Sequence, residues 1–460
     1  MPGSGHTERH FKATQASRVV TLCWLVALCS ALAACDAAIP VAPTASTSTE
    51  TPVTSATELS ASPTPSVDLS ISETHWVEFP QQGEWALIGT LTNREPHAVE
   101  EVMLSLQLPG SPSIQTLETT PIPAQIQPSA EALFQFRLPD GSRPQDYALS
   151  YSAKISNDDS LLEIKVDVLE RRQALDGGLM LLGEVQNQGA AFLHLKAVYI
   201  LLLDYQDIPL GIAVSEHILP SLAPNDRSPF SASSASYIEA DSWKAFVEAI
   251  PEKMPPALPL EITDGFNTET TARGYPFFLG FVENRGVTPW WLNLDVVYSQ
   301  EGQMLGMDTL ALPFPLPPRD RTAFILDPSQ ALPPATWLQE EPGKIEIQFY
   351  PDAWKSLPSL EEPFQIPVAI TQFEQIGSQL YLQAELTNTL SVPVFDAVIY
   401  LRVNDVRGRI RTVGWSDSLQ RLPAGETQNL RINLPIPKDL ALNLAEFDVR
   451  AFAFMQGQSH

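Results

Sequence analysis

A short motif that ends in asparagine occurs four times in this chain of 460 residues. Its copies are Gly89–Asn93, Gly183–Asn187, Gly280–Asn284 and Ala384–Asn388, so the asparagines lie 94, 97 and 104 residues apart. A proline follows each asparagine after 35, 37, 34 or 35 residues, and these prolines are Pro128, Pro224, Pro318 and Pro423. Two landmarks in matched register predict four copies of one structural unit.

Each repeat carries the pattern of short β-strands. Residues 162–168 alternate between apolar and charged side chains, and residues 197–203 are rich in branched aliphatic side chains. Both patterns are typical of strands. The 41 prolines disfavour long helices, because proline interrupts a helix interior. Six or seven short strands in each repeat of roughly 100 residues predict an immunoglobulin-like β-sandwich.

The predicted fold is therefore all-β, with four tandem immunoglobulin-like β-sandwich modules after a signal peptide and a disordered Ser/Thr/Pro linker. The predicted boundaries are 1–34 for the signal peptide, 35–70 for a lipidated cysteine and tether, and 71–158, 159–256, 257–363 and 364–460 for the modules. Residues 241–250 (DSWKAFVEAI) fit an amphipathic helix on their own pattern. Their position in the repeat favours the closing strand instead.

The first 35 residues predict export and lipid attachment. Three basic residues precede an uncharged run from Val19 to Ala34, which is shorter than the roughly 20 apolar residues of a membrane-spanning helix. Such a run is typical of a secretory signal. Its end, Leu32-Ala33-Ala34-Cys35, resembles the bacterial lipoprotein box, which implies cleavage before Cys35 and acylation of its thiol. The alternative is an ordinary signal peptide with an incidental cysteine.

The residues around this cysteine agree with an anchored protein. The other two cysteines, Cys23 and Cys29, precede the predicted cleavage site, so the mature chain would form no disulfide. Residues 41–66 contain 13 serines or threonines and no apolar periodicity, which predicts an extended stalk. We therefore expect a lipid-anchored protein on the outer, extracytoplasmic face of a cell membrane.

Charge and motif content argue against several classes of partner and against a catalytic site. The chain has 54 acidic and 28 basic residues, for a net charge of −26. This balance argues against nucleic acid, since phosphate binding needs a basic face. The sequence holds no HxH, HExxH or CxxC pattern and no nucleophile-elbow or phosphate-loop motif. We therefore predict no metal site, no cofactor and no catalytic residue.

The second repeat resembles a known family. It combines Gly183-x-Val-x-Asn187, an apolar strand that ends at Leu203-Asp204, and a Leu222-x-Pro224 turn. These features resemble the FxLyD-type domains of bacterial exported lipoproteins and, more broadly, immunoglobulin-like adhesion modules. The first repeat lacks the aspartate turn after its third strand. The resemblance implies a sandwich outside the cytoplasm and no known catalytic residues.

The recurring asparagines have two interpretations. Asn93, Asn187, Asn284 and Asn388 could be ligands, because they recur. A structural turn motif is favoured, because asparagine tolerates left-handed backbone and can cap a turn with its side chain.

The Trp290-Trp291 pair supplies the candidate contact residues. The position six residues after each motif asparagine is apolar in every repeat, so we expect Trp290 in the core. The next position holds Glu100, His194, Trp291 or Phe395, and this mixture predicts an outward side chain. Trp291 and Phe395 are therefore candidates for ligand or partner contact. The alternatives are a stacking site for a sugar or protein and a patch between modules.

Carboxylates cluster at two predicted junctions, Asn157-Asp158-Asp159 and Glu361-Glu362. They could bind calcium. A solvated acidic linker is favoured, because the EF-hand spacing is absent.

The function that fits best is a non-enzymatic, membrane-anchored exported lipoprotein whose repeats act as an interaction or scaffolding rod at the cell envelope. Its partners would be the membrane, through the lipid, and a protein or other envelope component. The alternative is an accessory glycan- or solute-binding lipoprotein that uses an aromatic patch in the third module.

Overall fold

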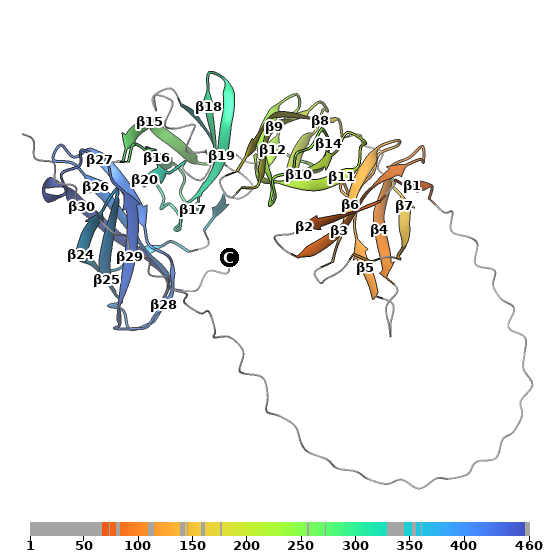
Figure 1. Cartoon of the computed structure of the whole chain (residues 1–460). Helices are drawn as coiled ribbons and strands as arrows, with labels where there is room; N and C mark the ends of the chain where they lie inside the picture. Colours follow the sequence, from red (N-terminus) through yellow and green to blue (C-terminus); the bar gives the residue numbers. More distant parts are fainter. Residues whose placement is uncertain are drawn as a thin grey trace, which may run out of the picture. The chain divides into compact units, whose positions relative to one another are not determined.

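The computed structural model describes residues 67–72, 74–79, 83–108, 115–138, 143–144, 146–157, 162–174, 177–254, 257–271, 273–328, 345–351, 356–359 and 361–455 (Figure 1). Within these ranges the regular structure consists of antiparallel strands and one 3-10 helix, η2 (Leu442–Leu444). No helix there is long and apolar enough to cross a membrane. The predicted signal peptide, Cys35 and most of the linker lie outside the described residues.

The first module places two sheets around one core. One sheet contains β1 (Leu69–Ile71), β2 (His75–Phe79), β3 (Glu84–Asn93) and β6 (Glu131–Leu138); the other contains β4 (Val99–Leu108), β5 (Gln115–Thr119) and β7 (Ala148–Ile155). Leu87, Leu104 and Phe134 are fully buried between them. Val67 and Leu69 are also buried in this core, so the module begins a few residues before the predicted boundary at 71.

The second module is one continuous antiparallel sheet of seven strands. These are β8 (Ile164–Gln173), β9 (Leu179–Asn187), β10 (Phe192–Leu203), β11 (Pro209–Ile218), β12 (Ser221–Leu222), β13 (Arg227–Ser234) and β14 (Ser242–Glu252). The sheet is continuous because β13 pairs with both β9 and β11. Strand β14 pairs with β10 along its whole length, which confirms a strand rather than a helix over the ambiguous segment.

The third module repeats the two-sheet arrangement. Strands β15 (Leu260–Thr270), β16 (Pro276–Asn284) and β20 (Arg321–Leu326) face β18 (Asn293–Gln300), β19 (Gln303–Ala311) and β21 (Glu346–Pro351) across a shared apolar core. A short pair, β17 (Trp290–Trp291) and β22 (Leu357–Pro358), adjoins them. Phe278, Tyr298 and Phe324 fill the core.

The fourth module has the same plan. One sheet contains β24 (Val368–Ile376), β25 (Gln379–Thr387) and β29 (Thr427–Pro435); the other contains β23 (Phe364–Gln365), β26 (Val394–Asn404), β27 (Ile410–Trp415), β28 (Leu419–Leu422) and β30 (Glu446–Phe454). Leu382, Ile399 and Ile432 are buried between the sheets. The four cores confirm an all-β chain of tandem β-sandwich modules.

The first residue of each Asn motif packs against a side chain on the next strand. Gly89, Gly183 and Gly280 lie directly opposite Phe134, Phe230 and Phe324, whereas Ala384 lies opposite Leu430. A Cβ atom on Gly89 would lie 2.6 Å from Cζ of Phe134. The phenyl ring therefore fits only because the glycine has no side chain. In the fourth module Ala384 has a Cβ atom, and its partner Leu430 is smaller than phenylalanine.

Neighbouring modules touch through buried apolar side chains. In the first module Ala86 and Ile88 of β3 are buried on the face opposite their own core, because their neighbours Leu87 and Leu91 point into it. Strands that are buried on both faces carry continuous apolar runs, as β3 does. Among the described residues, each pair of consecutive modules shares one apolar cluster: Ala86, Ile88, Leu201 and Ile212; Leu182, Leu219, Val297 and Met307; Phe277, Phe314, Val398 and Phe452.

Candidate functional site

The four motif asparagines make one repeated set of contacts, and each is buried. The Nδ2 amide of Asn93 donates to the carbonyl oxygens of His97 at 2.8 Å and Ile126 at 2.9 Å. Its Oδ1 atom accepts from the backbone N–H of Glu95 at 2.9 Å. Equivalent bonds recur at Asn187, Asn284 and Asn388. The amide donors and the amide oxygen are thus committed to the backbone of their own module.

The left-handed backbone expected at these asparagines lies elsewhere, in the turn that each asparagine clamps. Ser129, Asn225, Arg319 and Gly425 have positive φ angles of 61°, 63°, 59° and 72°. The N–H of each donates to the carbonyl oxygen of its motif asparagine, at 2.8 to 3.0 Å. The asparagines stay extended because they continue the strand pairing into this turn. The prolines do not occupy the same turn position in every module. Pro423 lies two residues before the left-handed residue, whereas the other three prolines lie one residue before it.

The structure brings the two predicted contact residues to one junction. The indole ring of Trp291 stacks on the ring of Phe454, with ring centroids 6.0 Å apart and ring planes at 24°. Phe454 is fully buried and pairs with Phe395 between β30 and β26. Trp290 packs against the core of the third module. Trp291 and Phe395 therefore adjoin the same ring where the third and fourth modules meet, which corresponds to a patch between modules.

The predicted carboxylate clusters are not assembled into a metal site in the described residues. Asp158 and Asp159 lie outside those residues. Glu361 accepts a hydrogen bond from the backbone N–H of Met455 at 2.7 Å. Across the described ranges no three His, Cys, Asp or Glu side chains are arranged to hold an ion.

A partly buried polar cluster between the second and third modules was not predicted. The Thr309 hydroxyl donates to Oδ1 of Asp295 at 2.7 Å, and Nδ1 of His217 lies 3.1 Å from the same hydroxyl. Because a hydroxyl has one proton to donate, His217 donates to Thr309. Burial raises the pKa of the neighbouring Asp308, whose carboxylate accepts the Thr309 N–H at 2.8 Å. The cluster places titratable groups against an apolar junction.

An arginine joins the third and fourth modules. The Arg411 guanidinium donates to both oxygens of Glu269, at 2.7 and 2.9 Å, and to Asp439 at 2.6 Å. Its side chain is only 10% exposed. These hydrogen bonds raise the pKa of Arg411, and the bond from Arg411 lowers the pKa of Asp439. A cavity of about 500 Å³ lies beside this group, but its charged residues are largely committed to one another.

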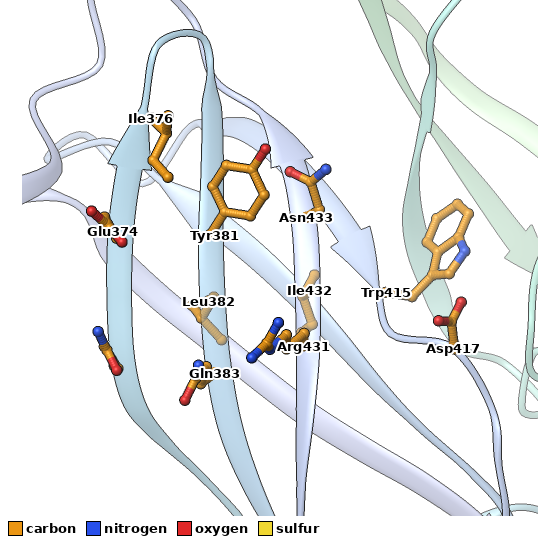
Figure 2. A pocket seen from close by; sticks show the side chains of 11 residues that line it. Glu374, Ile376, Tyr381, Leu382, Gln383, Trp415, Asp417, Arg431, Ile432 and Asn433 are labelled. Carbon is orange, nitrogen blue, oxygen red and sulfur yellow. The ribbon is translucent and has the colours of Figure 1, made fainter. Parts of the chain in front are cut away.

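An open cleft of about 610 Å³ lies on the fourth module (Figure 2). Its lining combines aromatic, aliphatic and polar side chains: Gln372, Glu374, Ile376, Tyr381, Leu382, Gln383, Trp415, Asp417, Arg431, Ile432 and Asn433. Strands β24, β25 and β29 form its floor, and the segment after β27 forms its wall. All of the lining residues belong to one module.

Sequence reasoning missed this cleft. A β-bulge between Ile370 and Gln372 shifts the register of β24, so the alternation of the strand does not show which side chains share a face. The available signal was in β25, where Tyr381 occupies a polar-face position between the buried Leu380 and Leu382. An aromatic residue on the polar face of a strand could have marked the site.

No protein-family model matches this chain, and no curated protein matches it either. Among solved structures, it is similar to red sea bream transglutaminase at 12% identity and a TM-score of 0.16, over 44% of this chain and 31% of that one. The chain thus spans less than a third of that enzyme. It is also similar to a tetra-tandem repeat from the extending region of a large adhesion protein, at 10% identity and a TM-score of 0.12, over 84% of this chain and 98% of that one.

A third similar structure is Escherichia coli alpha-2-macroglobulin activated by porcine elastase. It is 10% identical with a TM-score of 0.12, over 84% of this chain and 44% of that one. At these scores none of the three matches carries a functional argument.

Proposed function

We propose that this protein is a non-enzymatic, lipid-anchored exported protein whose β-sandwich modules act as an interaction scaffold at the cell envelope. The continuity of the apolar contacts between modules carries this proposal. Each pair of consecutive modules shares a buried cluster, and Arg411 adds an ionic contact between the last two. Such contacts hold successive modules together, as a scaffold that presents its loops to partners requires.

The use of the recurring polar residues also supports a scaffold. The motif asparagines would be the obvious candidates for repeated ligand sites. Their amides are instead committed to the backbone in every module. The repeated feature therefore serves folding, and interactions are left to the loops and faces that differ between modules.

Lipid attachment is tested at Cys35. Cells that produce the chain are fed an alkyne fatty acid, and the labelled protein is followed in membrane and soluble fractions. We expect label and membrane association in the native chain, and loss of both in Cys35→Ser with folding intact, because two or more acyl chains give stable anchoring. Labelling that persists in Cys35→Ser would contradict the anchor.

The scaffold role is tested by crosslinking in intact cells. A photoreactive amino acid replaces Tyr205, Val287 or Val406, which are 79%, 79% and 67% exposed and belong to different modules. We expect at least one of the three exposed sites to capture an envelope protein that the buried control probe does not capture. A probe at the buried Phe134 is the matched control. If every exposed site captures only the proteins found with this control, the scaffold proposal fails.

A further inference from the structure

The floor of the cleft on the fourth module consists of two rows of side chains. Glu374, Tyr381 and Asn433 lie directly opposite one another across β24, β25 and β29. Gln372, Gln383 and Arg431 form the neighbouring row. Adjacent strands are about 4.8 Å apart, so a row across three strands spans about 10 Å. The floor therefore has the width of a small cyclic ligand and presents planar polar groups on both sides of one aromatic ring.

The wall of the cleft is fixed by the rest of the module. Trp415 ends β27, and the bridge between Ser416 and Ile432 holds the following residues beside β29. Trp415 also packs against the core of the third module and against the apolar cluster at the junction of the third and fourth modules. Asp417 follows on the same wall, as Figure 2 shows. A second aromatic ring and a carboxylate are thus held at the side of the floor.

The polar groups of the floor are available for a ligand. The side chains of Glu374, Tyr381, Arg431 and Asn433 make no hydrogen bond or ion pair with any other residue in the described part of the chain. Tyr381 is 42% exposed. The guanidinium of Arg411 at the module junction differs, because two carboxylates already bind it.

We propose that this cleft binds a neutral oligosaccharide. Sugar hydroxyls act as donors and acceptors, which matches the carboxylate, amide and guanidinium groups of the two rows. The apolar face of a sugar ring would lie against Tyr381, with Trp415 at its side. The volume is within the usual range for ligand sites.

Charge and topology favour this occupant over others. Two carboxylates, Glu374 and Asp417, accompany a single cation, Arg431, and the whole chain has a charge of −26. An anionic polysaccharide would be repelled by this balance. An extended peptide would need an open sheet edge for strand addition. The floor is a sheet face instead, with its central strand paired on both sides.

The test uses the full chain in lipid nanodiscs and four neutral hexasaccharides: cellohexaose, chitohexaose, maltohexaose and xylohexaose. Isothermal titration calorimetry should give a dissociation constant below about 1 mM for at least one of them. Tyr381→Ala and Asn433→Ala should each weaken that binding by about tenfold or more, which is typical of one lost key contact. Tyr381→Phe keeps the ring and should weaken it less than Tyr381→Ala.

Tyr205→Ala is the matched control, because it removes a more exposed aromatic residue from the second module. It should leave binding unchanged. The proposal is overturned if none of the four neutral hexasaccharides binds with a dissociation constant below about 1 mM. It is also overturned if Tyr381→Ala binds as tightly as the native chain, or if only hexagalacturonate, an anionic control, binds. These outcomes are independent of the fatty-acid labelling and crosslinking results, so the proposed scaffold role is tested separately.

Discussion

Each motif asparagine ties a strand end to a turn more than 30 residues away. Its Nδ2 amide donates to two carbonyl oxygens, one in the following loop and one in the distant turn, and its Oδ1 atom caps the following loop. A buried carbonyl without a donor costs about 1–3 kcal/mol. One side chain therefore joins two backbone segments that are distant in sequence, which explains why asparagine stands at this position in every module.

Replacement of Asn284 should be severe. Asn284→Ala removes three hydrogen bonds of a buried side chain, so we expect a loss of about 3–5 kcal/mol in the free energy of unfolding, measured by denaturant titration. Asn284→Asp keeps the shape but has no amide donor and should be similarly destabilised. Thr288→Ala is the control, because only the backbone oxygen of Thr288 takes part. A loss below about 1 kcal/mol in Asn284→Ala would show that the clamp contributes little.

The glycine that begins the motif is tied to its aromatic partner. Gly89→Ala would place a Cβ atom 2.6 Å from Phe134 and 2.9 Å from Cγ2 of Thr74, so we expect destabilisation by about 1–3 kcal/mol. Phe134→Leu alone should also destabilise, by leaving a cavity.

The double variant Gly89→Ala/Phe134→Leu reproduces the Ala384–Leu430 pair of the fourth module. Its loss of stability should be smaller than the sum of the two single losses by about 1 kcal/mol. Simple additivity in this double-mutant cycle would mean that the ring and the absent side chain are not coupled.

At the scale of elements, the turn after each clamp depends on one left-handed residue. Gly425 has φ of 72°, and a Cβ atom there would meet nothing within 4 Å. Gly425→Ala should therefore cost about 1 kcal/mol from backbone conformation alone. Arg319→Gly is the matched change in the third module, where an exposed side chain occupies the same conformation at φ of 59°. We expect Arg319→Gly to leave the free energy of unfolding unchanged or to raise it. Equal destabilisation by both variants would contradict the dependence of these turns on a left-handed residue.

The order of the strands was predictable from sequence, because alternation and turn residues are local properties. The repeat even decided residues 241–250, where the local pattern favours a helix and the structure has β14. Register was less predictable. Pro423 follows its motif asparagine at nearly the same distance as the prolines of the other modules, but its place in the turn differs by one residue. Only the backbone angles reveal this difference.

The cleft was harder to predict, because its residues come from strands that are distant in sequence. Tyr381, Asn433 and Trp415 meet only after β25 pairs with β29 and the segment after β27 lies beside it. The junction role of Trp291 had the same difficulty, since its partner Phe454 lies more than 160 residues further along the chain.

At the scale of the whole molecule, an ionic group joins the third and fourth modules. Arg411→Met would leave the half-buried Glu269 unpaired, so we expect a loss of about 3–5 kcal/mol in unfolding free energy. Arg411→Met combined with Glu269→Gln should recover part of this loss, because the remaining partner, Asp439, is 67% exposed and its charge is solvated. Denaturant titration of the full chain measures both. Equal losses in the single and double variants would contradict a paired charge.

The junction of the second and third modules should respond to pH. Burial raises the pKa of Asp308. The protonated form is therefore favoured by folding, and this contribution is present below the ordinary aspartate pKa and is lost as the pH rises through the raised value. Asp308→Asn keeps the acceptor for the Thr309 N–H without the charge. It should raise the Tm at pH 7 and change it little at pH 3.

Asp320→Asn is the matched control, because Asp320 accepts an equivalent bond from the next residue in an exposed position. Its Tm should follow that of the native chain at both pH values. A lower Tm for Asp308→Asn at pH 7 would mean that the charged carboxylate is needed at the junction.

Burial of the inner strands on both faces limits how such a chain can change in length. If the second module were deleted, Ala86 and Ile88 of the first module would face Val297 and Met307 of the third, which pack against other side chains in the native chain, and two mismatched apolar surfaces would favour aggregation. Excision from the interior is thus disfavoured. New units are tolerated best when they are copied together with the surface of the neighbour that they will meet.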